Sequence, residues 1–256
     1  MTDRFQDKVV IVTGASSGIG KVSALAFARE GAKVAIAARR VDQGEQTVNE
    51  IKKEGGDAFF VQTDVSRAQD VRNMVSMTIK TYGRLDCAFN NAGIVGDALI
   101  PTADHTEENW DDVLSVNLKG VWLCMKYQIP EMLKQGRGAI VNNSSVYGLA
   151  ASTVGHVPYA VSKHGVIGLT KTAAIEYAKQ GIRVNAVCPG YTHSDMVDPA
   201  IESFPDEFAR MLANDIPMGR IAETEEITRA VLWLCSDESS FVTGHALAAD
   251  GGWLAK

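Results

Sequence analysis

Lys8-Val-Val-Ile-Val-Thr-Gly-Ala-Ser-Ser-Gly-Ile-Gly20 is the stretch that decides the fold of this chain. Its first residues are mostly apolar and β-branched, which is typical of a buried strand. Gly14, Gly18 and Gly20 follow, spaced differently from the common G-x-G-x-x-G fingerprint, and a helical pattern opens behind them. Glycine lets backbone N–H groups approach an anion closely, and the helix N-terminus then faces that anion. The stretch therefore predicts a strand–loop–helix unit that binds a pyrophosphate.

Strand-like and helix-like stretches alternate along the rest of the chain. Strands are predicted over 8–13, 33–38, 57–62, 85–89, 138–144, 182–187 and 245–249. Helices are predicted over 19–30, 42–54, 67–82, 107–117, 120–135, 158–180 and 224–235. This alternation predicts an α/β fold, a Rossmann-type doubly wound parallel sheet of seven strands with helices on both faces. Because no linker or internal repeat interrupts it, we expect residues 1–256 to form a single domain.

Composition excludes several classes of protein. The chain has 256 residues, of which 46% are hydrophobic, and that is enough for one sizeable core. A net charge of −6 does not indicate binding to nucleic acid or to an anionic membrane. The N-terminal stretch lacks the apolar run of a signal peptide, and no stretch is long enough for a membrane span. Scattered cysteines without a Cys-x-x-Cys pair are typical of reduced thiols, so we expect a cytoplasmic protein. The histidines show no spacing that indicates a metal site.

Tyr159 and Lys163 lie four residues apart in a predicted helix. This spacing places a phenol and an ammonium group on one helical face. A free tyrosine titrates near pH ~10. A neighbouring lysine cation favours the phenolate, so we expect the pKa of Tyr159 to move toward the range of a general acid or base. Alone, the pattern also fits an exposed tyrosine beside a solvated lysine.

Five motifs occur in one order along the chain. They are Thr13-Gly-x-x-x-Gly-x-Gly20, Asn90-Asn-Ala-Gly93, Asn117, Ser145 and Tyr159-x-x-x-Lys163. Together they resemble the short-chain dehydrogenase/reductase family, and the resemblance covers the chain from Val9 to Trp253. It implies an NAD(P)-binding domain and an oxidoreductase that acts on CH–OH donors without a metal.

The resemblance implies catalytic roles for Asn117, Ser145, Tyr159 and Lys163. Tyr159 would exchange a proton with the substrate oxygen, while Lys163 would lower its pKa and bind the nicotinamide ribose. Ser145 would hydrogen-bond the same oxygen, although chemistry alone does not choose between it and the preceding Ser144. Asn117 would hold a water that links Lys163 to solvent, but an asparagine in a helix is also a common surface or kink residue.

The resemblance also implies a set of cofactor contacts. They are Gly14, Ser16, Ser17, Gly18, Ile19, Gly20, Arg39, Asp64, Val65, Asn91, Ala92, Gly93, Tyr159, Lys163, Pro189, Gly190, Thr192 and Ser194. Either Thr192 or Ser194 would hold the nicotinamide carboxamide.

Cofactor choice depends on the residues after the second predicted strand. An acidic residue about 20 positions past the glycine loop binds the ribose diol and selects NAD. Here Ala38 stands in that place and Arg39 follows it. A guanidinium group suits a 2′-phosphate, so we expect NADP(H) to be favoured and NAD(H) to remain possible. The alternative is that Arg39 is a solvated charge at a strand end.

Substrate contacts and the reaction follow from the same resemblance. The expected substrate-binding residues are Ser145, Tyr147, His156, Tyr159 and Tyr191, and the insert at about 190–219 is expected to be a lid. The predicted reaction interconverts a ketone and a secondary alcohol of small-molecule size. One alternative is a 3-oxoacyl-[acyl-carrier-protein] reductase, which needs a basic rim to receive its acidic carrier. The other is a non-catalytic dinucleotide-binding sensor or scaffold.

Assembly is indicated by two helical patterns, 107–135 and 158–180, that are apolar on more than one face. Their apolar residues include Trp122, Met125, Met132, Leu133, Val166, Leu169 and Ala173. A second apolar stripe needs a partner, and so does the apolar edge formed by 246–250 and Trp253. We therefore expect a homotetramer of two-fold symmetry.

Overall fold

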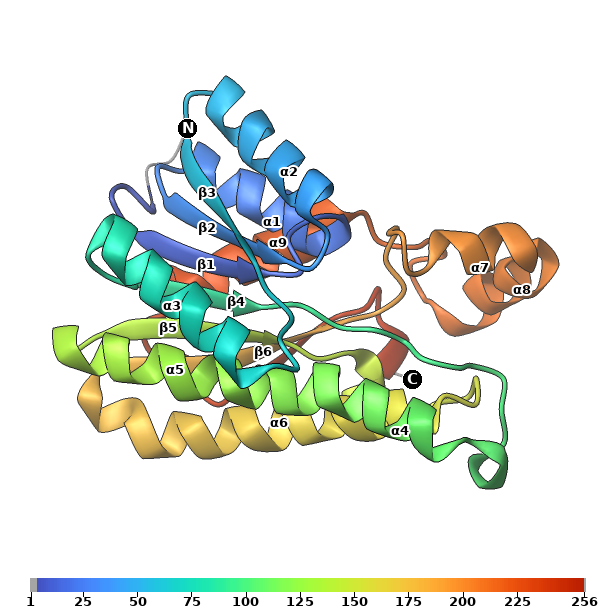
Figure 1. The fold of residues 1–256 in the computed structure, drawn as a ribbon. Coiled ribbons are helices and arrows are strands. Elements are labelled where there is room, and N and C mark those ends of the chain that lie inside the picture. The colour runs from blue at the N-terminus through green and yellow to red at the C-terminus, as the bar shows by residue number, and fades with distance from the viewer. Residues whose placement is uncertain (1–3, 256) are drawn as a thin grey trace.

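The computed structural model describes residues 4–255, with the side chains of 207, 208, 211 and 213 excepted. Its centre is one parallel sheet with the strand order β3-β2-β1-β4-β5-β6-β7 (Figure 1). The strands are β1 (Val9–Thr13), β2 (Lys33–Ala38), β3 (Asp57–Gln62), β4 (Cys87–Asn90), β5 (Gly138–Asn143), β6 (Ile182–Pro189) and β7 (Ala246–Ala249). The predicted seven-stranded, doubly wound fold is confirmed, because the order reverses between β1 and β4.

Helices cover both faces of this sheet. They are α1 (Gly18–Arg29), α2 (Val41–Lys53), α3 (Ala68–Tyr82), α4 (Glu107–Leu114), α5 (Gly120–Gln135), α6 (Val157–Tyr177), α7 (Asp198–Ser203), α8 (Pro205–Asp215) and α9 (Thr224–Cys235). Helices α1, α2 and α9 pack on one face, and α3, α5 and α6 pack on the other (Figure 1).

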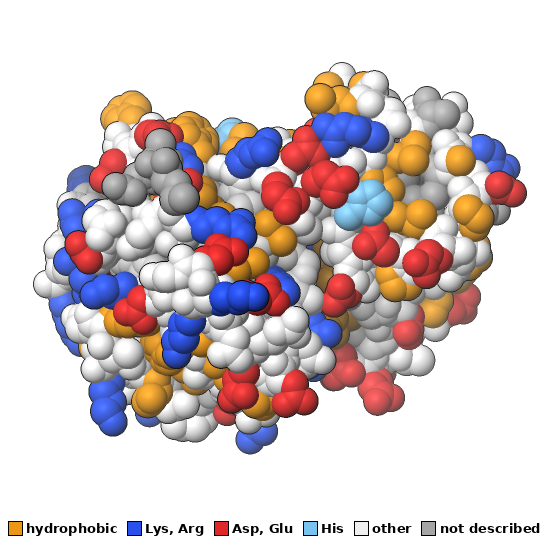
Figure 2. Space-filling model, turned by 90° about the horizontal axis from the view of Figure 1, so that it is seen from above, with side chains coloured by type: hydrophobic (Ala, Val, Ile, Leu, Met, Phe, Trp, Pro, Cys, Tyr) orange, Lys and Arg blue, Asp and Glu red, His pale blue; other side chains and the backbone are white. Residues whose placement is uncertain are grey.

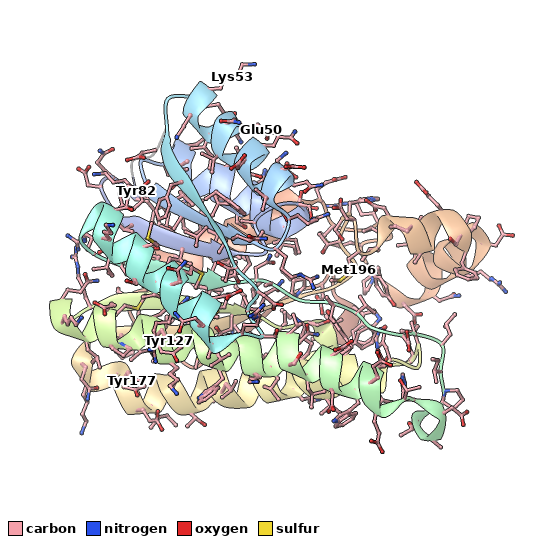
Figure 3. The ribbon with its side chains drawn as sticks, in the orientation of Figure 1. Glu50, Lys53, Tyr82, Tyr127, Tyr177 and Met196 are labelled. Carbon is pink, nitrogen blue, oxygen red and sulfur yellow. The ribbon has the colours of Figure 1, made fainter. Side chains whose placement is uncertain are left out.

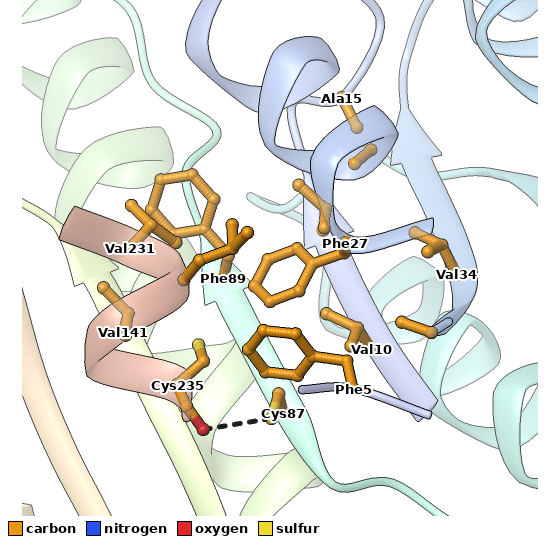
Figure 4. Close-up of a cluster of buried hydrophobic side chains, with 14 of the residues drawn as sticks. Phe5, Val10, Ala15, Phe27, Val34, Cys87, Phe89, Val141, Val231 and Cys235 are labelled. Atoms are coloured by element: carbon orange, nitrogen blue, oxygen red, sulfur yellow. Dashed lines mark hydrogen bonds between the residues drawn. The ribbon is translucent and has the colours of Figure 1, made fainter. Parts of the chain in front are cut away.

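Two apolar cores result, one on each side of the sheet. All five side chains of β1 are buried, as expected for a central strand that is covered on both faces. On the first face Phe27 from α1 meets Phe5 edge-on, with ring centroids 4.9 Å apart (Figure 4). Cys87 and Cys235 lie beside them, and the Cys87 thiol donates to the Cys235 carbonyl at 3.6 Å.

Helices α4 and α5 are joined without a break, although the sequence predicts a boundary at about 117–120. A π-helical turn, Ser115–Lys119, connects them and carries the buried Asn117. A π-turn adds a residue to the helix and often marks a functional site. Asn117 is a poor helix former, and the helix accommodates it in this π-turn.

The segment after β6 leaves the sheet and forms α7 and α8. In Figure 1 these helices stand apart from the layers, and Met196, labelled in Figure 3, lies where the segment departs. Met196 and Phe204 are both exposed. The segment that carries the two helices therefore extends from the carboxyl end of β6, with exposed apolar side chains before α7 and between α7 and α8.

Candidate active site

A cleft of about 640 Å³ opens at the carboxyl ends of the strands. This edge is where ligands bind in doubly wound sheets. Its lining includes nearly all of the cofactor residues predicted from sequence. Those that line it are Gly14, Ser16, Ser17, Gly18, Ile19, Arg39, Asp64, Val65, Asn91, Ala92, Gly93, Tyr159, Lys163, Pro189, Gly190, Thr192 and Ser194. Gly20 is the exception, because it is buried beneath the loop, against Gly14 and Asn91.

The glycine loop has the close packing that a dinucleotide site requires. Gly14 and Gly18 adopt φ values of +66° and +52°, a region that side chains rarely enter. A Cβ on Gly14 would lie 2.9 Å from Ala92 Cα, whereas one on Gly18 would meet only Ser194 Cβ, at 3.4 Å across the cleft. The loop thus exposes bare backbone between the sheet and the insert, and it fits a pyrophosphate at the start of α1.

Asn91 fixes the loop to the neighbouring strand ends. Its side-chain amide donates to Thr13 O at 3.0 Å, and its oxygen accepts from the Asn143 amide at 2.9 Å. The carboxyl ends of β1, β4 and β5 are thereby cross-linked beneath the cleft. Asn143 was not predicted from sequence, since one asparagine before a serine pair carries no motif.

Two arginines follow β2, and the sequence interpretation assigned only one of them. Arg39 is exposed and lines the cleft. Arg40 donates to the hydroxyls of Ser16 and Ser17, at 3.1 and 2.6 Å. It also lies 3.8 Å from Asp195, at the start of the insert. Arg40 therefore uses the two serine hydroxyls that the resemblance assigns to the cofactor.

Asn117 connects the cleft wall to α6. Its side chain accepts from Ile94 N and donates to Ile94 O, both at 2.8 Å, and donates to Ser162 Oγ at 3.2 Å. These bonds occupy the amide group of Asn117 and hold the backbone at Ile94 against the π-turn. The predicted link from Asn117 through water to Lys163 stays a prediction.

Tyr159 and Lys163 face the cleft from the first turns of α6. Lys163 Nζ lies 5.3 Å from the centroid of the Tyr159 ring and donates to Asn143 O at 2.8 Å. Burial raises the pKa of Tyr159 to about 12, against a lowering effect of its hydrogen bond to Ser145. Burial also lowers the pKa of Lys163 to about 8.

These two pKa shifts correct the expectation from sequence. We expected the lysine cation to bring the tyrosine pKa down, but burial of the phenol outweighs any such effect. The i, i+4 spacing is real, yet the ammonium group lies over the ring and bonds to a backbone carbonyl. Tyr159 is consequently a protonated phenol at neutral pH, which is the form that gives a proton away.

The two adjacent serines have different partners. Ser144 is buried, and its hydroxyl donates to Lys163 O at 2.9 Å, which ties β5 to α6. Ser145 accepts from Tyr147 N at 3.2 Å and hydrogen-bonds Tyr159. This geometry favours Ser145 as the hydroxyl beside the phenol.

An aromatic cluster packs behind Tyr159. His156 lies 5.1 Å from the Tyr159 ring and 4.9 Å from the Tyr147 ring. Tyr147 also meets Trp253 at 5.5 Å, and its hydroxyl lies 2.9 Å from that of Tyr191. Trp253, expected from sequence at an exposed edge, instead packs inside its own chain. Whether Tyr147, His156 and Tyr191 touch substrate stays a prediction.

The hydroxyls of Thr192 and Ser194 both donate to backbone carbonyls. Thr192 bonds to Gly190 O at 3.1 Å and is buried, while Ser194 bonds to Thr192 O at 3.2 Å and faces Gly18 across the cleft. Both line the cleft, so either can reach a cofactor there.

Two kinds of feature are missing from the described part of the chain. Within residues 4–255, no group of three or more His, Cys, Asp or Glu side chains is placed to hold a metal ion. The same residues contain no helix whose length and hydropathy suit a membrane crossing.

Comparison with known proteins agrees with the geometry. The family model described as Enoyl-(Acyl carrier protein) reductase matches residues 14–254. The A-factor type gamma-butyrolactone 1'-reductase of Streptomyces virginiae is 44% identical over 257 residues, which cover 99% of each chain. A 3-oxoacyl-[acyl-carrier-protein] reductase of Staphylococcus aureus is 42% identical, covering 96% of this chain and 97% of its own. Cyclohexanol dehydrogenase of an Acinetobacter species is 40% identical, covering 100% and 98%.

Solved structures give the same result. Levodione reductase superposes with a TM-score of 0.94 at 34% identity, over 98% of this chain and 99% of its own. A variant of actinorhodin polyketide ketoreductase, crystallised with NADPH, superposes with a TM-score of 0.91 at 34% identity, over 99% of each chain. Sequence, fold and these comparisons together place this chain in the short-chain dehydrogenase/reductase family of oxidoreductases.

Proposed function

We propose that this protein is an NADP(H)-preferring oxidoreductase that interconverts a ketone and a secondary alcohol, with Tyr159 as the general acid and base. The observation that carries the proposal is the shared cleft. Tyr159, Lys163 and Ser145 line the same cavity as the glycine loop and Arg39. A reacting carbonyl and a dinucleotide can therefore occupy one enclosed space.

The chain's own residues would bind, orient and supply the proton. NADP(H), when bound, supplies or accepts the hydride. The Ser145 hydroxyl would hydrogen-bond the carbonyl oxygen and stabilise the charge that develops there. Tyr159, whose pKa is raised to about 12, would deliver its proton to that oxygen. Lys163, held by Asn143 O, would stabilise the phenolate that remains.

The preference for NADP(H) is supported by charge beside the ribose end of the cleft. Ala38 offers no acid to bind a ribose diol, and Arg39 is exposed next to it. Arg40 adds a second guanidinium, which reaches the glycine loop. A 2′-phosphate would find two cations at this place, and the diol of NAD(H) would not find the acidic residue that usually follows this strand.

The main alternative is a 3-oxoacyl-[acyl-carrier-protein] reductase, which the Staphylococcus relative is named for. Such an enzyme receives an acidic carrier and needs basic residues near its entrance. The insert beside the cleft instead carries Asp195, Asp198, Glu202, Asp206 and Asp215 against a single basic residue, Arg210. Acidic side chains are frequent over this lobe, at the right of Figure 2. The charge distribution therefore favours a small substrate, in line with the cyclohexanol dehydrogenase relative.

We also propose a homotetramer. Exposed apolar side chains lie on the helices α4, α5 and α6, at Trp110, Trp122, Leu133 and Ile175, and elsewhere at Phe241, shortly before β7. Of the residues that suggested a second stripe, Met125, Met132, Val166 and Ala173 are in the core, so the exposed ones carry the argument. Two different surfaces support two interfaces of two-fold symmetry.

The four cysteines are free and buried, which supports a cytoplasmic location.

The test is a screen of small ketones and alcohols with each nicotinamide cofactor, followed by absorbance. The proposal expects ketone-dependent oxidation of NADPH that is faster than that of NADH. Turnover of a 3-oxoacyl carrier alone would support the alternative. Cofactor binding without turnover of any substrate would support a sensor.

A further inference from the structure

One arginine connects two sides of the candidate cofactor cleft. Arg40, the N-cap residue of α2, donates from Nη2 to the hydroxyls of Ser17 and Ser16, at 2.6 and 3.1 Å. Its other terminal nitrogen, Nη1, lies 3.8 Å from the carboxylate of Asp195. All four residues line the cleft. The guanidinium group of Arg40 is therefore shared between the glycine loop and the first residues of the insert.

The bonds to the two serines leave the glycine loop ready for an anion. Ser17 is the N-cap residue of α1, yet its side chain does not cap the helix. Both serine oxygens accept from Arg40, and among the described residues neither hydroxyl donates its own proton to another group. The two O–H groups and the guanidinium are all hydrogen-bond donors at the start of a helix, and such a place fits a phosphate group.

Asp195 is an anion that already lies beside this place. The residue before it, Ser194, is the one that a Cβ on Gly18 would meet at 3.4 Å, so the start of the insert lies against the glycine loop. The side chains of Arg40 and Asp195 are 50% and 67% exposed. Solvent screens an ion pair of this kind, which therefore contributes little and is readily exchanged for a stronger one.

A ribose 2′-phosphate would be a stronger partner for the same guanidinium group. Arginine can bind a phosphate through two parallel hydrogen bonds, and a phosphate monoester carries more negative charge than a carboxylate at neutral pH. NADP(H) would therefore take Arg40 from Asp195, whereas NAD(H), which lacks this phosphate, would leave the pair as it is. Loss of the pair would weaken the binding of NADP(H) alone.

We propose that Asp195 is a specificity-determining residue, which competes with the 2′-phosphate for Arg40 and so limits the preference for NADP(H) over NAD(H). Another acid of the insert, Asp198, is not placed for this role, because it pairs with His193 at 2.8 Å and lies outside the cleft lining. This inference rests on the proposed function and deepens it, since the resemblance to the family assigns no role to Asp195.

The experiment measures dissociation constants for NADP⁺ and NAD⁺ by calorimetry. Asp195→Asn keeps the shape of the side chain and removes its charge, so the Kd for NADP⁺ should fall about threefold, within the range of an exposed ion pair. The Kd for NAD⁺ should not change. Asp198→Asn removes an acid of the same insert and is the matched control, which should change neither constant.

Arg40→Gln separates competition for the arginine from general charge repulsion. This variant should bind NADP⁺ more weakly but still measurably, since Arg39 also lines the cleft. When Asp195→Asn is added to it, NADP⁺ binding should not become tighter, because no guanidinium group is left to compete for. The four proteins form a double-mutant cycle for the Arg40–Asp195 pair.

Two results would overturn the inference. One is an Asp195→Asn variant that binds NADP⁺ no more tightly than the wild type. The other is a tightening that persists in the Arg40→Gln background or that Asp198→Asn reproduces. Failure of the proposed cofactor preference looks different: wild-type protein would bind NAD⁺ more tightly than NADP⁺, and the change in the Kd for NADP⁺ caused by Asp195→Asn would still decide the inference.

Discussion

The floor of the cleft and the insert that overhangs it are built in opposite ways. Beneath the floor, Asn90 donates to both Gln128 and Asn142, at 3.1 and 3.0 Å, and Asn142 donates to Thr170 at 3.0 Å, all of them buried. The insert is held by contacts near solvent, such as His193 Nδ1 with Asp198 at 2.8 Å. Buried amide networks rigidify a structure, whereas regions with few buried contacts open at low free energy.

This difference assigns separate tasks to the two regions. A proton donor must be held close to its target, and the floor holds Tyr159 and Lys163 through strand ends that are themselves cross-linked. A lid must move to admit substrate, and contacts near solvent are suited to such motion. On the proposed function, the floor would therefore carry the chemistry and the insert would control access.

The largest expected effect comes from removing the proton at the floor. Tyr159→Phe should lower kcat at least a hundredfold, because general acid catalysis contributes about 10²–10⁴-fold. Binding of NADPH, measured by fluorescence, should change little, since the ring remains. A variant that kept more than about a tenth of kcat, a loss below about 1.4 kcal/mol, would remove Tyr159 from the role of acid.

A second prediction concerns stability. Asn90→Ala leaves the side-chain amide of Gln128 and the side-chain oxygen of Asn142 without the partner that they have in Asn90, at about 1–3 kcal/mol for each unpaired group. We expect urea unfolding to show a loss of about 2–4 kcal/mol in the free energy of unfolding. The control in the insert is Phe204→Ser, an exposed position where a change within about 0.5 kcal/mol is expected. Equal losses at the two sites would contradict the contrast between floor and insert.

Cofactor preference gives a third, smaller effect. Arg39→Ala should raise the KM for NADPH about tenfold and that for NADH much less, since only NADPH loses a charged partner worth about 1.5–3 kcal/mol. Arg229→Ala, which removes an exposed arginine of α9 outside the cleft lining, is the matched control. A wild-type enzyme that uses NADH better than NADPH would refute the assignment.

The smallest effect is a pH dependence. Lys163, with a pKa lowered to about 8, is protonated below that pH and loses its charge above it. The charge stabilises the phenolate left on Tyr159, so kcat for ketone reduction should be level in the neutral range and halved near pH 8. A rate that remains level well into alkaline solution would show that the lysine charge is not used.

The sequence predicted the fold because periodicity and the glycine loop act locally. The run from Lys8 to Gly20 contains a strand, a turn and the start of a helix. The alternation of strand and helix patterns along the rest of the chain indicates the parallel sheet. The second helix begins at Gly120 as predicted, but the expected gap at 118–119 is filled by a π-turn, in which Asn117 bonds to Ile94 and Ser162. The helix propensity of Asn117 is a local property and does not take into account bonds to residues that are distant in sequence.

The site was predicted as a list of residues, and its interactions were not. Arg40, Asn143 and Trp253 take their importance from neighbours that are distant in sequence: the glycine loop, Asn91 and Tyr147. The pKa of Tyr159 was predicted in the wrong direction for the same reason, because burial depends on everything packed around the phenol. The four-residue spacing identifies Tyr159 and Lys163 as neighbours on one helical face, but it does not indicate how deeply their side chains are buried.

On the proposed function, this cleft brings a nicotinamide hydride to a ketone carbon while Tyr159 protonates the oxygen. NADPH carrying deuterium at both positions of its nicotinamide C4 carbon tests this directly, with the alcohol product analysed by mass spectrometry and NMR. We expect one deuterium on the carbinol carbon of the product and a solvent-exchangeable hydrogen on its oxygen. An alcohol without deuterium at that carbon would contradict it.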